Sequence, residues 1–324
     1  MKARIIEVQR EYYKVCYETE AGKREKHARL KGSLLHQVQS SPMKCYPTVG
    51  DYVKIRCNEQ GDDVIEEVRP RTSWFSRQDP ATGGQTEQGI AANFDYILLV
   101  QSLNQNFNVR RMERYLASAW DTGATPIIVL TKADLVRQEE GEHAEELIEE
   151  YREQMKQVAP GVEVLVISAL TGEGMENVDR LVTPGKTLVL VGSSGIGKST
   201  LINALAEEEI MGTSEIREAD GRGRHTTTHR QMIALKNGAF LIDTPGMRAL
   251  GMWGVEEGVG EVFYDVEELA KDCRFRDCRH DKETGCAVKE AIQAGILSQK
   301  RFQSWQKLQR EARHNARKLQ RMKR

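Results

Sequence analysis

The stretch GSSGIGKS, from Gly192 to Ser199, has the spacing of a phosphate-binding loop, G-x-x-x-x-G-K-[ST]. It follows the apolar run KTLVLV and precedes the helix-like run STLINALA, which is the strand–loop–helix context that the motif needs. Its glycines allow backbone N–H groups to surround phosphate oxygens at a helix N-terminus, where the dipole favours anions. We therefore predict that Lys198 reaches the β- and γ-phosphates of a nucleotide and that Ser199 holds Mg²⁺.

A phosphate loop alone does not separate a GTPase from an ATPase or a kinase, but a second motif narrows the choice. The tetrapeptide DTPG, Asp243–Gly246, follows the apolar run AFLI. An acidic residue at the end of such a strand can hold Mg²⁺ through water, and Gly246 can donate its N–H to the γ-phosphate.

Two loops earlier in the chain have the composition of a guanine-binding site. TKAD, Thr131–Asp134, follows the apolar run TPIIVL and differs in one letter from the NKxD loop of GTP-binding proteins. The Asp134 carboxylate would accept hydrogen bonds from guanine N1–H and the 2-amino group, whereas adenine lacks that pair of donors. Lys132 would lie along the base, and the Thr131 hydroxyl would do part of the tethering done by the usual Asn. In SALTGEG, the pair Ser168–Ala169 would present a backbone N–H to guanine O6.

These loops occur in the order guanine, guanine, phosphate, DTPG, whereas in ordinary GTPases the phosphate loop precedes the guanine loops. Each follows a predicted strand, and ligands of open α/β sheets bind at the carboxyl ends of the strands. We interpret the chain as circularly permuted, which is tolerated where the natural termini lie close together and the break falls in an exposed loop.

The elements that must position these loops are strands alternating with helices. Apolar runs occur at 96–103, 125–131, 162–168, 186–192 and 239–244, with helical patterns at 110–120 and 142–158, which predicts an α/β fold with a parallel sheet covered on both faces. Short alternating segments at 3–8, 12–19, 51–57 and 63–68 favour a small β-barrel of the OB type, although an irregular β-rich extension is the alternative. The polar, glycine-rich stretch from Arg69 to Gly89 is interpreted as a linker. We predict three domains: 1–72 an RNA-binding OB fold, 73–252 a permuted GTPase domain, and 253–324 a zinc-binding domain.

A cysteine and histidine cluster follows the last predicted strand. Cys273, Cys278, His280 and Cys286 form C-x4-C-x-H-x5-C. Three sulfurs and one imidazole complete a closed tetrahedral set, which indicates structural rather than catalytic zinc. Clustered cysteines in a chain without an apolar secretion signal are typical of metal ligands rather than disulfides, and we expect a cytoplasmic protein with no membrane segment.

The end of the chain is basic, although the whole chain of 324 residues has a formal net charge of only −1. From Lys300 onward there are ten lysines and arginines against one acidic residue, Glu311. Phe302, Trp305 and Leu308, spaced three apart, predict a helix that packs its apolar side on the zinc domain. Its basic face would meet rRNA, or would simply be solvated.

Taken together, the barrel-like start, the permuted loop order, GRGRHTTTHR at Gly221–Arg230 and CRFRDCRHDKETGC make the chain resemble the circularly permuted, ribosome-small-subunit-dependent GTPases of the RsgA (YjeQ/YloQ) family, over nearly its whole length. The resemblance implies an OB domain, a permuted GTPase domain, a zinc domain and a role in late maturation of the small ribosomal subunit, which stimulates GTP hydrolysis.

The segment GRGRHTTTHR lies where the first switch of a GTPase belongs. The resemblance favours Thr227 as the Mg²⁺ ligand, with Thr226 and Thr228 as alternatives. Met247 stands where many GTPases carry a water-positioning Gln, and His225 is the best replacement because an imidazole can orient or deprotonate water near neutral pH; its alternative is a packing role in the loop.

We predict His225, Lys198 and Thr227 as catalytic, with GTP, Mg²⁺ and one Zn²⁺ as ligands and the small ribosomal subunit as the partner of a monomer. A GTP-sensing RNA-binding protein with little turnover is the alternative. The residues predicted to bind nucleotide are Thr131, Lys132, Asp134, Ser168, Ala169, Gly192, Ser193, Ser194, Gly195, Ile196, Gly197, Lys198, Ser199, Thr200, Asp243 and Gly246.

Overall fold

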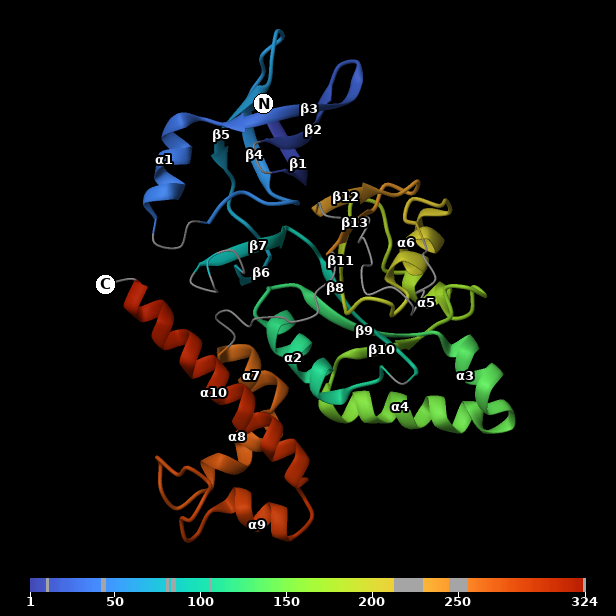
Figure 1. Ribbon diagram of the computed structural model, residues 1–324, viewed down its shortest axis with the longest axis vertical. Helices are drawn as coiled ribbons and strands as arrows, with labels where there is room; N and C mark the ends of the chain where they lie inside the picture. Colours follow the sequence, from blue (N-terminus) through green and yellow to red (C-terminus); the bar gives the residue numbers. More distant parts are fainter. Residues whose placement is uncertain are drawn as a thin grey trace.

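The computed structural model describes residues 1–9, 12–41, 45–79, 82, 86–104, 106–212, 230–244 and 256–322. A small barrel, a sheet covered by helices and a helical C-terminal region follow one another along the chain (Figure 1). The barrel has its own apolar core, and each face of the sheet has another. Among the described residues, none of the helices combines the length and the apolar character needed to cross a membrane.

The N-terminal barrel has five strands in the order β1-β2-β3-β5-β4, and pairing of β4 with β1 closes it. All neighbours are antiparallel except β3 and β5, which run parallel. This closed OB-like arrangement confirms the predicted barrel and excludes the irregular extension. The elements are β1 (Lys2–Val8), β2 (Tyr13–Thr19), β3 (Gly22–Leu30), α1 (Gly32–Ser40), β4 (Tyr52–Arg56) and β5 (Asp63–Val68).

The stretch interpreted as a linker instead forms a hairpin of β6 (Trp74–Gln78) and β7 (Glu87–Ala92), so that interpretation was wrong. Phe75 and Ile90 are buried in the core that also contains helix α2 (Val109–Trp120). Gly89 allows the close approach of the two strands, because a Cβ there would lie 2.2 Å from the Trp74 ring. The apolar positions are too few and too far apart for the sequence pattern to show these strands.

The central sheet runs in the order β10-β9-β8-β11-β13-β12, with β12 antiparallel to its neighbour and the other five strands parallel. All five predicted apolar strands are present, and β12 was not predicted. Because both faces are covered, successive residues are buried on opposite sides, which explains the continuous apolar runs. The strands are β8 (Tyr96–Ser102), β9 (Thr125–Thr131), β10 (Glu163–Val166), β11 (Thr187–Val191), β12 (Arg230–Ala234) and β13 (Phe240–Asp243).

Helices cover the two faces of this sheet as separate layers. Ile97 and Leu99 of β8 pack with α2 and α4, whereas Leu98 and Val100 pack with α5 and α6. The elements of the first layer are α2 (Val109–Trp120), α3 (Ala133–Glu140), the 3₁₀ turn η2 (Gly141–His143) and α4 (Ala144–Val158), and those of the second are α5 (Met175–Asp179) and α6 (Lys198–Ala206).

The C-terminal region is helical and lies against the first layer (Figure 1). Its helices are α7 (Glu256–Val262), α8 (Tyr264–Lys271), α9 (Ala287–Gln293) and the long α10 (Gln299–Met322). The predicted tail helix is therefore confirmed. Phe302, Trp305 and Leu308 are buried as expected, and α10 also contacts the domain of the central sheet, because Arg114 of α2 donates to Glu311 at 3.0 Å.

The barrel and the central sheet form one continuous sheet, because β1 pairs antiparallel with β12. The registers Glu7↔Gln231 and Val8↔Arg230 join β12, which begins at the last residue of the GRGRHTTTHR segment, directly to the barrel. Arg4 strengthens the junction: its guanidinium is buried and donates to the carbonyl of Asn93 at 2.7 Å and to the Thr187 hydroxyl at 2.9 Å.

Candidate functional site

The predicted phosphate loop connects β11 to α6. Gly195 and Gly197 have φ values of +79° and +95°, which L side chains rarely adopt. A Cβ at Gly192 would lie 2.7 Å from the Val100 carbonyl oxygen, so the start of the loop also requires glycine. Ser193, Ser194 and Ile196 complete the turn, and Ser199 and Thr200 lie half-buried in the first turn of α6.

Lys198 is the first residue of α6, and its side chain folds back over the loop. Its Nζ donates to the carbonyl oxygens of Gly192 and Ser193, each at 2.7 Å. Burial lowers the pKa of Lys198, and the nearby Asp243 carboxylate acts in the opposite direction. The ammonium is thus held among the loop carbonyls, where an anion would be its natural partner.

Asp243 ends β13, next to the strand that leads into the phosphate loop. It is 7% exposed, and its Oδ1 forms no hydrogen bond among the described residues. Burial raises the pKa of this carboxyl group, while Lys198 lowers it. A buried carboxylate oxygen without a partner is the kind of group that a Mg²⁺-bound water satisfies, so the residues present fit the predicted ion.

Thr131 joins the TKAD loop to the phosphate loop. It ends β9, is 2% exposed, and its hydroxyl donates to the Ile196 carbonyl at 2.5 Å. The hydrogen bond joins the two loops, and the sequence predicted a tethering role for Thr131. The following residue, Lys132, has φ +64° and precedes α3, which begins with Ala133 and Asp134.

The TKAD and SALTGEG loops are joined in turn by their polar side chains. Ser168 is fully buried, and its Oγ donates to Asp134 Oδ1 at 2.7 Å. The same Oγ accepts from the Thr171 N–H at 3.2 Å, which orients the hydroxyl hydrogen toward Asp134. Ala169 follows, half-buried, in the loop. The three loops are therefore connected at the carboxyl edge of the sheet.

Some predicted residues are not placed, and one contact was not predicted. His225, Thr226, Thr227, Thr228, Gly246 and Met247 lie outside the described residues. Arg111, in the first turn of α2, donates to Ser193 Oγ at 3.2 Å and was missed. The available signal was that α2 follows β8, whose carboxyl end lies at the same edge as the phosphate loop.

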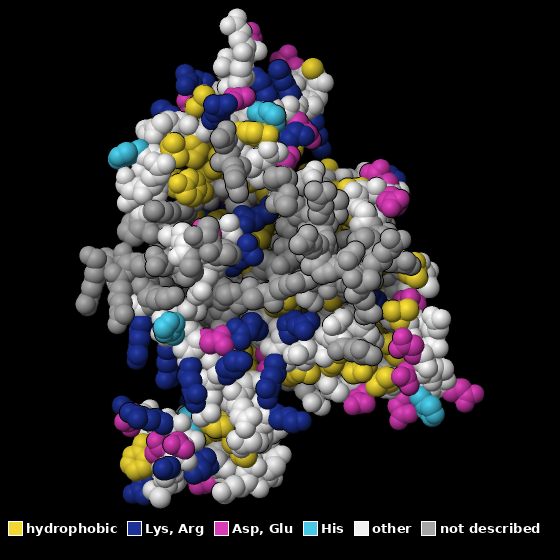
Figure 2. All heavy atoms as spheres, viewed as in Figure 1, with side chains coloured by type: hydrophobic (Ala, Val, Ile, Leu, Met, Phe, Trp, Pro, Cys, Tyr) yellow, Lys and Arg dark blue, Asp and Glu magenta, His cyan; other side chains and the backbone are white. Residues whose placement is uncertain are grey.

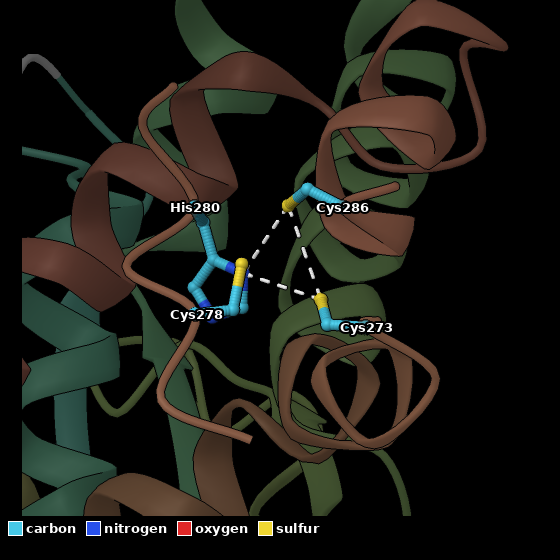
Figure 3. Close-up of side chains that lie close together, drawn as sticks. All are labelled: Cys273, Cys278, His280 and Cys286. Atoms are coloured by element: carbon cyan, nitrogen blue, oxygen red, sulfur yellow. Dashed lines mark hydrogen bonds between the residues drawn. The ribbon is translucent and has the colours of Figure 1, made fainter. Parts of the chain in front are cut away.

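The predicted metal ligands lie together (Figure 3). Each residue contributes one ligand atom, and these four atoms lie within 4.8 Å of one another: they belong to Cys273, Cys278, His280 and Cys286. His280 Nδ1 lies 3.5 Å from Cys273 Sγ and 3.4 Å from Cys286 Sγ, and the two sulfurs are 3.9 Å apart. Zinc bonds of about 2.3 Å to sulfur and 2.0 Å to nitrogen in a tetrahedron give ligand separations of roughly 3.5–3.8 Å. The four residues therefore fit one tetrahedral metal ion.

His280 is held in place by the chain around it. It has φ +59°, and its ring packs against Trp305 of α10, with ring centroids 5.5 Å apart. Burial lowers its pKa, which favours the neutral imidazole that a metal requires. The cluster thus fixes the loop between α8 and α9 to the buried side of α10.

In the comparison with protein families, the RsgA GTPase profile matches residues 68–253, more than half of the chain. The protein called small ribosomal subunit biogenesis GTPase RsgA 2 from Listeria monocytogenes serotype 4b is 46% identical over 315 residues, covering 97% of this chain and 84% of that protein.

Solved structures agree. YjeQ from Thermotoga maritima superimposes with a TM-score of 0.66 at 25% identity, covering 96% of this chain and 98% of that one. YloQ, described as a circularly permuted GTPase, gives 0.63 at 27% identity, covering 97% and 95%. The loop order, the strand order and these similarities lead to one conclusion: the chain belongs to the RsgA GTPase family and is a GTP hydrolase with a circularly permuted GTPase domain.

Proposed function

We propose that this GTPase binds the small ribosomal subunit, assists its late maturation and leaves on hydrolysis of GTP. The observation that carries the nucleotide part is the hydrogen bond from Thr131 to Ile196, at 2.5 Å. It makes the guanine-reading loop and the phosphate loop one unit, so that base and phosphates are recognised at a fixed separation. The names of the relatives, as small ribosomal subunit biogenesis GTPases, support the partner.

Guanine is read by Asp134. The Ser168 hydroxyl holds Oδ1 of this carboxylate, which leaves both oxygens able to accept from N1–H and the 2-amino group. Adenine offers no such pair of donors, and a site of this kind rejects the wrong base by about 10⁴-fold. The Lys132 side chain lies along the base, and the backbone N–H of Ala169 donates a hydrogen bond to guanine O6.

The phosphates occupy the loop Gly192–Thr200, with Lys198 on the β- and γ-oxygens. Ser199 and Thr227 are the protein ligands proposed for Mg²⁺, with Asp243 acting through water and Gly246 donating to the γ-phosphate. Bound Mg²⁺ neutralises charge on these oxygens. His225 orients the attacking water and takes up its proton, and Lys198 stabilises the charge that develops on the leaving β-oxygen.

The flanking domains supply the ribosomal contact. We propose the boundaries 1–72, 73–252 and 253–324, with Zn²⁺ bound by Cys273, Cys278, His280 and Cys286. Exposed cations follow one face of α10: Lys300, Lys307, Arg310, Arg313 and Arg317. Figure 2 shows lysine and arginine side chains gathered over the lower half of the molecule, where α2 and α10 lie. Such a face attracts rRNA phosphate, and we propose that the chain binds as a monomer.

The substitution Asp134→Asn tests whether this side chain recognises guanine. In Asp134→Asn, the side chain presents one acceptor and one donor, which matches xanthine, whose 2-oxo group replaces the 2-amino group of guanine. We expect the affinity for GTP to fall by about 10²-fold or more and xanthosine triphosphate to bind better than to the wild type. ATP should compete with GTP in neither protein. Unchanged GTP affinity in Asp134→Asn would refute the assignment.

A further inference from the structure

A cavity of about 400 Å³ lies in the C-terminal region, between α8 and the loop that follows α9. These two helices lie side by side at the end of the molecule far from the barrel (Figure 1). Leu269 and Leu297 form its apolar part, and Ile296 stands at its mouth. The cavity is distinct from the cysteine cluster, whose ligands do not line it, and from the nucleotide loops.

Ile296 is unusually exposed for its position in the chain. Gly295, with φ +75°, ends α9, and the N–H of Ile296 donates to the Ala291 carbonyl at 2.9 Å. After a glycine of this kind, the next apolar side chain commonly packs back on the helix. Ile296 is instead 77% exposed, on a backbone fixed by hydrogen bonds. A second large side chain, Tyr264 at the start of α8, is 62% exposed. A rigid apolar side chain beside a cavity suits a docking contact.

The charged lining of the cavity is acidic. Asp265, Glu268 and Asp272 face one cation, Lys271. Asp265 is paired with Arg301 at 3.0 Å, and Glu268 is paired with Lys271. The Asp272 side chain forms no hydrogen bond or ion pair among the described residues, and the residue occupies the C-cap position of α8, where the helix dipole disfavours a carboxylate. A cation brought to Asp272 would relieve that cost.

The charge of the cavity lining is opposite to that of the exposed face of α10. The exposed face of α10 is basic and suits phosphate, whereas nucleic acid would be repelled by the lining of the cavity. An apolar cavity with an acidic rim is complementary to a Lys- or Arg-rich polypeptide segment that carries an apolar side chain. We propose that the α8–α9 cavity docks such a segment from the protein component of the small ribosomal subunit, with the exposed Ile296 as its apolar contact and Asp272 as its charge contact; this rests on the proposed function.

The test compares two variants on two targets. Full-length Ile296→Ser and Asp272→Lys, loaded with a non-hydrolysable GTP analogue, are titrated against purified small subunits and against protein-free rRNA of the same subunit. We expect each variant to bind intact subunits about 5- to 10-fold more weakly and the bare rRNA no more weakly than the wild type does. Glu290→Lys is the matched control: it makes the same charge change on exposed α9, outside the cavity, and should not weaken binding to subunits.

Several outcomes would overturn the proposal. If the cavity faced RNA, Asp272→Lys would bind subunits more tightly, because it adds a positive charge next to phosphate. If the occupant were a second copy of this chain, light scattering would show a dimer that Asp272→Lys dissociates. Equal binding of wild type and both variants would also refute it. If the wild type itself failed to bind subunits, both the proposed function and this inference would be refuted. If the wild type bound and the variants bound equally well, only this inference would be refuted.

Discussion

The Thr131 hydroxyl links two loops of the proposed nucleotide site through one hydrogen bond. It lies between the loop that carries Asp134 and the Ile196 carbonyl of the phosphate loop. An Asn side chain at this position would reach further, but the hydroxyl is close enough to make the contact in a fully buried setting. A buried hydrogen bond of this kind is costly to lose, because the carbonyl then has no donor.

Thr131→Val keeps the shape of the side chain and removes the donor. We expect a loss of about 1–3 kcal/mol in local stability and a drop of about 10-fold in affinity for GTP, since the two loops lose their fixed separation. Isothermal titration with GDP and GTP measures this. Thr131→Ser, which retains the hydroxyl, should bind like the wild type; a Val variant as tight as the Ser variant would contradict the account.

The four clustered ligands predict a metal that is part of the fold. Purified protein should contain one Zn²⁺ per chain, and Cys278→Ser should lose it, because a three-ligand set binds far more weakly than a closed tetrahedron. Mass spectrometry of metals gives the content, and hydrogen exchange of the loop between α8 and α9 gives the structural effect. Cys57→Ser, which changes an exposed thiol of the barrel, is the control and should retain the metal. Zinc retained by Cys278→Ser would contradict the ligand set.

At the scale of single residues, the sequence predicted the positions whose role depends on local spacing. Lys198, Asp134, Ser168 and the four metal ligands all belong to short motifs. Ser168 contacts Asp134, Lys198 folds over its own loop, and the four metal ligands lie together as a separate cluster. Arg111 was missed because its partner, Ser193, lies 82 positions away and no local pattern links them.

At the scale of elements, the contact between α2 and α10 holds the C-terminal region on the GTPase domain. Arg301 of α10 donates to Glu113 of α2 at 2.9 Å, to the Val262 carbonyl, and to Asp265. The side chains of Glu113 and Arg301 are 3% and 10% exposed. Burial raises the pKa of Glu113, and Arg301 acts in the opposite direction. Removal of one partner would leave a buried charge unpaired.

Arg301→Met should therefore destabilise the α2–α10 contact by about 3 kcal/mol, and adding Glu113→Gln should restore part of that loss because no unpaired carboxylate remains. Hydrogen exchange of the α10 amides measures the local free energy of opening. Lys300→Met is the matched control, since Lys300 is exposed one position away on the same helix. A double variant that exchanges as fast as Arg301→Met would contradict the explanation.

The elements that the sequence predicted best are those with continuous apolar composition. In the parallel strands β8, β9 and β11, every residue after the first position of β8 and β9 is buried, on one face of the sheet or the other. Strand β3 was missed because only one of its nine residues, Ala28, is buried. The hairpin of β6 and β7 was missed because polar residues and a glycine separate its few apolar positions, and β12 was missed because only three of its residues, Met232–Ala234, are apolar.

At the scale of the whole molecule, permutation places both flanking domains next to the nucleotide loops. Strand β12 follows the segment predicted as the first switch and pairs directly with β1 of the barrel. The segment after Asp243 leads into the C-terminal helices. A change at the γ-phosphate therefore has a short covalent route to each flanking domain, which is the arrangement that a nucleotide-controlled release from a large partner requires.

The measurement that tests this account most directly is the rate of GTP hydrolysis by the purified protein, alone, with small ribosomal subunits, and with large ones. The account predicts slow hydrolysis alone, strong stimulation by the small subunit and none by the large subunit, with the stimulation lost in His225→Ala while binding to the small subunit persists. Equal rates under all three conditions would contradict the ribosomal role and leave only the nucleotide site standing.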